Sequence, residues 1–230
     1  MACEDFGFHE SADDLVAVIS SLQYNSLVDL LVEITHGNRV VLNAVTRIAE
    51  LSENKQNRIA ANDERLGEFA KEWVKEHHLG QPLTGAFFDI LVDIFHEMLL
   101  DYGAITPQME HLSDELLATS NYAPVMQELF DEAYAAHPEK FKLALLDARD
   151  ILGTYLADTW QRLSRQDLNF VDVAEVFLQV DQDHTGGRFE RLIRGNFKMR
   201  DIGLVQVGPQ LEPLGEDSHA NSVRTMLPMD

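Results

Sequence analysis

Apolar residues recur every three or four positions through residues 8–34, with polar and acidic residues between them. This spacing places the apolar side chains on one face of an α-helix. It predicts a single helix over the segment, or two helices with a bend near Asn25. The apolar positions are Leu15, Val18, Ile19, Leu22, Leu27, Leu30, Leu31 and Ile34.

Four further segments show helical spacing together with signals for helix ends. Thr84 is a candidate N-cap for the first segment, and Gly103 would end it. Thr106 and Pro107 would open the next helix, and Pro138 the last, since proline suits the first turn of a helix. The predicted helices cover residues 85–103, 108–118, 121–137 and 137–163.

Strand patterns are rare in this chain. Only residues 39–45 and 203–208 contain short apolar runs that could form strands. The charged stretch 50–69 predicts an exposed connection or a surface helix. We therefore expect a single, mainly α-helical, multi-helix domain over residues 1–205, followed by a loosely ordered tail over residues 206–230.

The balance of charge restricts the partners. The 18 Lys and Arg against 39 Asp and Glu give a formal net charge of -21, which repels phosphate backbones and argues against nucleic acid. Asp89 and Asp93 interrupt the best apolar run, so no membrane span is expected. Cys3 has no partner for a disulfide. The N-terminus carries acids where a secretory signal carries bases, so we expect a cytoplasmic protein unless an upstream segment directs export.

The first helix carries two acids that need an explanation. Glu10 and Asp14 lie one turn apart, on the same ridge as the apolar Val18 and Leu22. One interpretation is that both acids lie exposed in the first turn and interact with the positive end of the helix dipole. The other is that Glu10 is a metal ligand and Asp14 orients a ligating or catalytic histidine.

A His-Glu pair at residues 9–10 suggests the zinc signature HExxH, in which two histidines four residues apart bind the metal. The second histidine is missing, because Asp13 occupies its position. The other His-Glu pair, His96 and Glu97, has Leu100 there. Neither pair forms the signature, and the sequence predicts that His96 and Glu97 form a polar edge of their helix.

The segment FGFHESADDLVAVI, with its Glu-x-x-x-Asp pattern, resembles the third-ligand segment of gluzincin metallopeptidases, the thermolysin-like superfamily. Residues 80–95 and 173–203 are also similar to stretches of the helical C-terminal half of bacterial gluzincin-like proteins. The resemblance covers most of residues 6–203. It implies a fold like that C-terminal half, with Glu10 as the third zinc ligand and Asp14 in contact with an upstream zinc-binding histidine.

The resemblance also implies a histidine that stabilises the oxyanion of peptide hydrolysis. His78 is the first candidate for this role and His77 the second. The printed sequence contains no HExxH, so two zinc ligands and the general base are absent. We therefore expect the C-terminal part of a longer metallopeptidase, inactive alone, which binds zinc and cleaves peptides or proteins when a partner polypeptide supplies the missing half. The alternative is a degenerate relic or a non-catalytic acidic helical module that binds a partner helix in an apolar groove.

The stretch DQDHTGG at residues 181–187 resembles the opening of a calcium-binding EF-hand loop. Leu192 occupies position twelve, where the loop requires a bidentate glutamate. We expect a capped turn between two helices instead, with Gly186 or Gly187 at positive φ. A weak, nonstandard calcium site is the other possibility.

Overall fold

The computed structural model describes residues 2–37, 62–69, 78–116, 122–164 and 168–203. These residues form helices and short connections, with no strand among them, so the prediction of a mainly helical protein is confirmed. The possible strands at 39–45 and 204–208, most of the charged stretch 50–69, and the predicted tail lie outside the described residues.

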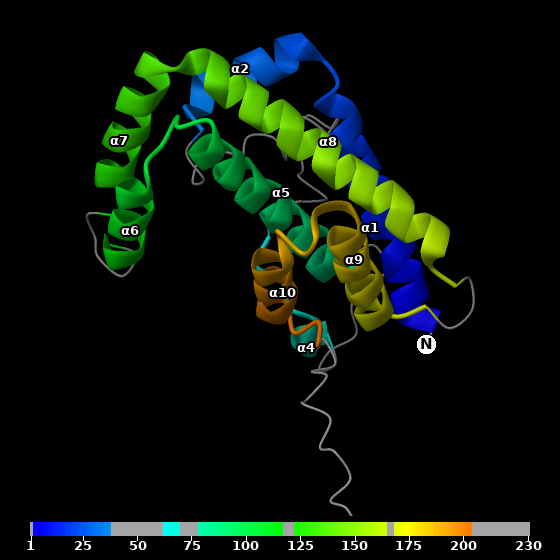
Figure 1. Ribbon diagram of the computed structural model, residues 1–230. Helices are drawn as coiled ribbons and strands as arrows, with labels where there is room; N and C mark the ends of the chain where they lie inside the picture. Colours follow the sequence, from blue (N-terminus) through cyan, green and yellow to red (C-terminus); the bar gives the residue numbers. More distant parts are fainter. Residues whose placement is uncertain (1, 38–61, 70–77, 117–121, 165–167, 204–230) are drawn as a thin grey trace, which may run out of the picture.

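Helix α5 (Gln81–Asp101) forms the centre of the fold. It contacts α8 (Pro138–Arg162), α1 (Ala2–Ser21) and α10 (Glu190–Met199), and most of its residues are buried. In Figure 1, α8 runs alongside α5, and α1 lies on the far side of α8 in this view. The apolar side chains of these helices belong to one core cluster. Apolar residues cover most of the circumference of α5, and its acids Asp89, Asp93 and Glu97 recur every four residues along one side. This pattern suits the central position, because a helix with neighbours on several sides has little solvent-facing surface.

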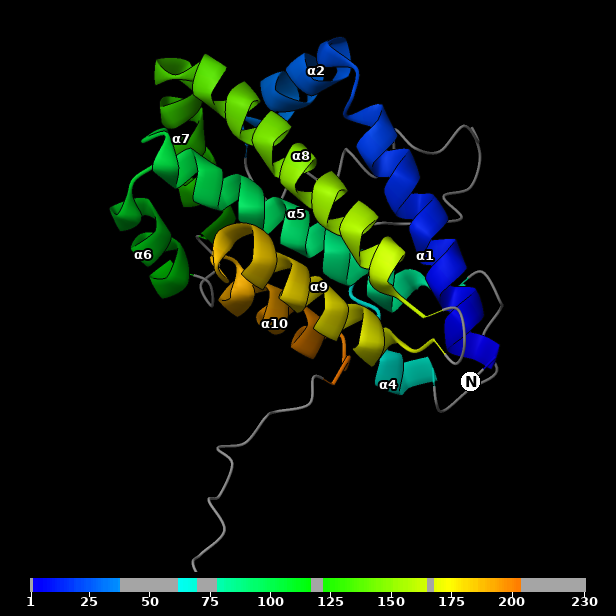
Figure 2. The same cartoon turned by 45° about the vertical axis from the view of Figure 1, so that its right-hand side comes forward.

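The remaining helices lie around α5. Helix α9 (Phe170–Thr185) packs on α8 and α10, as Figure 2 shows, with the short α4 (Leu66–Phe69) below them. Helices α6 (Pro107–Leu116) and α7 (Tyr122–Ala136) form a pair on another side of the molecule. The predicted helices after Thr106 and at Pro138 are confirmed.

The predicted bend near Asn25 is confirmed. Helix α1 ends at Ser21 and α2 (Asn25–Thr35) begins four residues later, with an angle of 91° between them. Leu15, Val18 and Leu22 are buried as the spacing predicts, whereas the side chain of Ile34 is 57% exposed. Within the described ranges no single helix is long and apolar enough to cross a membrane; only the bent pair α1 and α2 meets that criterion jointly.

The start of α5 differs from the prediction. The helix begins at Gln81, with Gly80 in the N-cap position and Pro82 in the first turn, so Thr84 is not the cap. The Thr84 side chain is buried inside the helix, and its amide donates to the Gly80 carbonyl at 2.9 Å. Pro82 explains the earlier start, because its fixed φ suits the first helical turn and its missing N–H has no intrahelical partner there.

A buried carboxylate organises the turn between α9 and α10. Asp181 is fully buried and accepts hydrogen bonds from the Tyr155 hydroxyl (3.0 Å), the Thr185 hydroxyl (2.6 Å) and the Phe189 amide (3.1 Å). Gly186, with φ of 74°, ends α9, and the next glycine also has positive φ. The capped turn is therefore confirmed, and Asp181 serves the turn as an acceptor for protein donors.

Arg200, at the end of α10, is also buried and fixes the segment before α4. Its guanidinium donates to Asp89 on α5 at 2.5 Å, to the Asn62 side chain at 3.2 Å and to the Glu64 carbonyl at 3.3 Å. The Arg200 carbonyl accepts from the Leu66 amide at 3.0 Å. Arg200 thus connects α10 to α5 through its guanidinium and to the first residue of α4 through its backbone carbonyl.

Candidate functional site

The two acids of the first helix lie at the edge of its buried face. Glu10 and Asp14 are one turn apart on α1 and both are half-buried. Their neighbours Ser11 and Leu15 are buried against the core, whereas Asp13 is exposed. The pair therefore lies between the core-facing side of α1 and its solvent-facing side.

The backbone of α1 touches the turn that precedes α5. A Cβ atom placed on Gly80 would lie 2.7 Å from the Gly7 carbonyl oxygen and 3.1 Å from the Cβ atom of Glu10. A Cβ on Gly7 would lie 2.7 Å from the Leu79 carbonyl oxygen. His78 is half-buried in the same turn, two residues before Gly80. The fold therefore brings Glu10 next to the turn that carries His78, while His77 lies outside the described residues.

The side chains at this junction do not form a metal site by themselves. Among the described residues, no group of three or more His, Cys, Asp or Glu side chains is arranged to hold a metal ion. A catalytic zinc site requires three protein ligands. Glu10 is one carboxylate, so the described part of the chain does not fit zinc without ligands from elsewhere.

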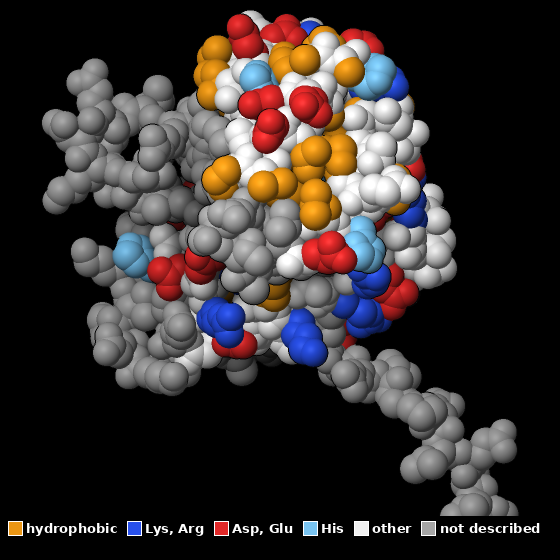
Figure 3. Space-filling view, turned by 90° about the vertical axis from the view of Figure 1, so that its left-hand side faces the viewer, with side chains coloured by type: hydrophobic (Ala, Val, Ile, Leu, Met, Phe, Trp, Pro, Cys, Tyr) orange, Lys and Arg blue, Asp and Glu red, His pale blue; other side chains and the backbone are white. Residues whose placement is uncertain are grey.

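A second candidate site lies at the other end of α5. A cavity of about 610 Å³ opens between α5, α6, α7 and α10. Figure 3 views the molecule from the side of α6 and α7 and shows apolar side chains gathered in the middle of this face, with Lys and Arg side chains below them. The apolar lining consists of Ile105, Met109, Met126, Phe130 and Leu192.

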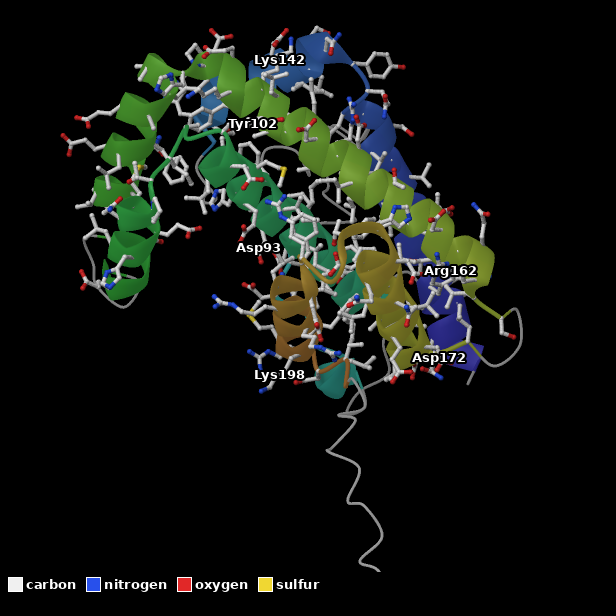
Figure 4. The ribbon with its side chains drawn as sticks, in the orientation of Figure 1. Asp93, Tyr102, Lys142, Arg162, Asp172 and Lys198 are labelled. Carbon is white, nitrogen blue, oxygen red and sulfur yellow. The ribbon has the colours of Figure 1, made fainter. Side chains whose placement is uncertain are left out.

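The charged lining of this cavity is divided between its walls. Asp93 and Glu97 come from α5 and Glu110 from α6, whereas Arg188 and Arg191 come from the start of α10 and the residues before it. Figure 4 shows Asp93 between α5 and α10. Acids thus line one side and guanidinium groups the other, above an apolar floor.

His96 and Glu97, which the sequence predicts as a polar edge of their helix, lie at this cavity. Both are half-buried and line the cavity. The His96 ring stacks on Phe130, with ring centroids 5.6 Å apart, and its Nε2 lies 3.4 Å from the Gly37 carbonyl oxygen. The sequence did not reveal this arrangement, because the spacing along α5 says nothing about α7 folding back over that face.

Comparisons with known proteins give this chain no relatives: no family model matches it, and neither does any curated protein or solved structure. Its class is therefore defined by the fold and the two candidate sites. It is a mainly helical protein with an acidic helix-turn junction at one end of α5 and a bipolar cavity at the other.

Proposed function

We propose that this chain is the helical part of a gluzincin-like zinc metallopeptidase, to which it contributes Glu10 as one zinc ligand and Asp14 behind it. The observation that supports the proposal is the position of Glu10, half-buried beside the turn that carries His78. The alternative, in which both acids lie on a solvated convex face, predicts full exposure of Glu10 and Asp14.

The proposal predicts which apolar side chains near Glu10 the missing segment would cover. Phe6, one turn before Glu10 on α1, is 38% exposed, and Val16 farther along the helix is 48% exposed. A segment that brings HExxH to Glu10 would cover Phe6.

The chemistry assigned to this chain is limited to what its residues can supply. A bound zinc ion would activate water and polarise the peptide carbonyl. Glu10 would bind the metal, and Asp14 would hold the imidazole of a zinc-binding histidine by accepting its N–H. His78 is the proposed donor to the oxyanion. The substrates would be peptides or proteins, and we assign no hydrolytic step to the 230 residues alone.

The first experiment is to translate the genomic DNA upstream of the Met1 codon in frame and to look for HExxH. If the motif is present, the full-length protein should retain zinc, measured by mass spectrometry after dialysis, and Glu10→Gln should lose it. Asp13→Asn is the matched control, because Asp13 is exposed on the same helix and should not affect zinc. A stop codon with no HExxH upstream, or full zinc retention by Glu10→Gln, would contradict the proposal.

The second candidate function is a non-catalytic binding module. The observation that favours it is the cavity between α5, α6, α7 and α10, which lies away from Glu10 and is lined by apolar and charged side chains. Such a module would keep its activity without zinc. Both functions are compatible in one protein, because they use opposite ends of α5.

A further inference from the structure

We propose that the cavity between α5, α6, α7 and α10 binds a short zwitterionic peptide with apolar side chains, whose carboxylate pairs with Arg191 and whose ammonium group pairs with Glu97. The proposal does not depend on zinc binding at Glu10, because the two sites lie at different ends of α5. Glu10 contacts the turn before α5, whereas Glu97 lies sixteen residues after the first residue of α5, Gln81, which is about 24 Å along the helix axis.

The size and floor of the cavity suit a ligand of this class. Its volume of about 610 Å³ falls within the range of pockets that bind small molecules. Met109 and Met126 belong to its apolar lining, and methionine side chains adapt their shape to different apolar groups. Phe130 offers an aromatic surface, and it is buried in the core. The floor would therefore take apolar side chains of varied shape.

Three of the five charged groups already interact with other groups, and Glu110 is one of them. Asp93 accepts a hydrogen bond from the Asn196 side-chain amide at 2.7 Å, and Arg188 donates to Asp101 on α5. Within the part of the chain that the structure describes, the Glu97 carboxylate and the Arg191 guanidinium make no ion pair or hydrogen bond, including with each other. These two groups are therefore the ones available to pair with ligand charges.

The arrangement of charge selects a ligand with both signs. A purely anionic ligand would approach the carboxylates of Asp93, Glu97 and Glu110, and a purely cationic one would approach Arg188 and Arg191. The carboxylate terminus of a free peptide would pair with the basic side chains of the cavity, and its ammonium terminus would pair with the acidic ones. A guanidinium matches a carboxylate in a two-pronged geometry, and an ammonium group donates readily to a carboxylate.

The probe is the dipeptide Leu-Phe, titrated into the folded protein by isothermal calorimetry. We expect saturable binding, and no binding of N-acetyl-Leu-Phe-amide, which has the same side chains without the terminal charges. Arg191→Gln and Glu97→Gln should each weaken binding about tenfold or more, as loss of a charge-assisted hydrogen bond does. Lys198→Gln is the matched control, because it removes an exposed cation of α10 that does not line the cavity and should leave binding unchanged.

Three results would overturn the proposal: no saturable binding of Leu-Phe at millimolar concentration, equal binding of the capped peptide, or unchanged affinity of Arg191→Gln. Circular dichroism of each variant verifies that the helices persist. Failure of this test would leave zinc retention by the full-length protein untouched, and loss of the zinc proposal would leave peptide binding untouched. The two proposals therefore fail separately.

Discussion

Gly7 on α1 and Gly80 in the turn before α5 meet backbone to backbone, with no room for a side chain at either position. A Cβ on Gly80 would lie 2.7 Å from the Gly7 carbonyl oxygen and 2.8 Å from the Ser11 amide nitrogen. This contact holds Glu10 against the turn that carries His78. The proposed zinc ligand thus depends on a close approach that only glycine allows.

Replacing Gly80 with alanine should destabilise the protein. Gly80 has φ of -80°, which alanine adopts easily, so the loss would arise from the steric contact and not from backbone strain. Overpacking of this kind costs about 1–3 kcal/mol of unfolding free energy, measurable by urea denaturation. Gly195→Ala is the control, because nothing lies within 4 Å of a Cβ there, and it should be neutral or slightly stabilising. Equal effects of both substitutions would contradict the role of the contact.

Removing the buried carboxylate of Asp181 should be more costly. Asp181→Ala leaves the Tyr155 hydroxyl and the Phe189 amide without their acceptor inside the protein. Each unsatisfied buried donor costs about 1–3 kcal/mol, so we expect a loss of about 3 kcal/mol in thermal or urea unfolding. Gln182→Ala, on the exposed side of the same helix end, should change stability by less than about 0.5 kcal/mol. A small effect at Asp181 would show that the turn holds without it.

Tyr155 gives a prediction for alkaline pH. Burial and the hydrogen bond to Asp181 raise the pKa of Tyr155 from 10.0 to about 12. The unfolded chain ionises this tyrosine first, so its contribution to stability is complete below about pH 10 and is lost as the pH rises toward 12. Tyr155→Phe should therefore flatten the decline of stability over this interval in chemical denaturation. If the stability of the variant and of the wild type declined equally between pH 10 and 12, the decline would not be due to Tyr155.

The buried cation of Arg200 gives a fourth prediction. Arg200→Ala should remove the donor that Asp89 and the Glu64 carbonyl share. Because Arg200 is buried but Asp89 is one-third exposed, we expect a loss of about 1–3 kcal/mol. Arg194→Ala is the control, because its pair with Glu190 one turn away is exposed and contributes less than about 1 kcal/mol. Comparable losses in thermal unfolding for the two variants would contradict a special role for Arg200.

The local signals in the sequence predicted most of the helices. The three-to-four spacing of Leu15, Val18 and Leu22 identified α1 and its buried face. Pro138 marked the start of α8, and Gly186 marked the end of α9. Thr84 was misassigned because threonine is a favoured N-cap residue, whereas Pro82 allowed the helix to begin earlier. These features depend on a few neighbouring residues, which is why a single sequence contains them.

The sequence by itself determined the helical class, the acidic surface charge and the position of Glu10 and Asp14 one turn apart. Only the tertiary structure decided what those helices face. Glu97 and Arg191 line the same cavity, although they lie nearly one hundred residues apart along the chain. No short stretch of sequence indicates that two distant residues share a cavity. The spacing of apolar residues in a helix specifies its buried face but not the helix that packs on that face.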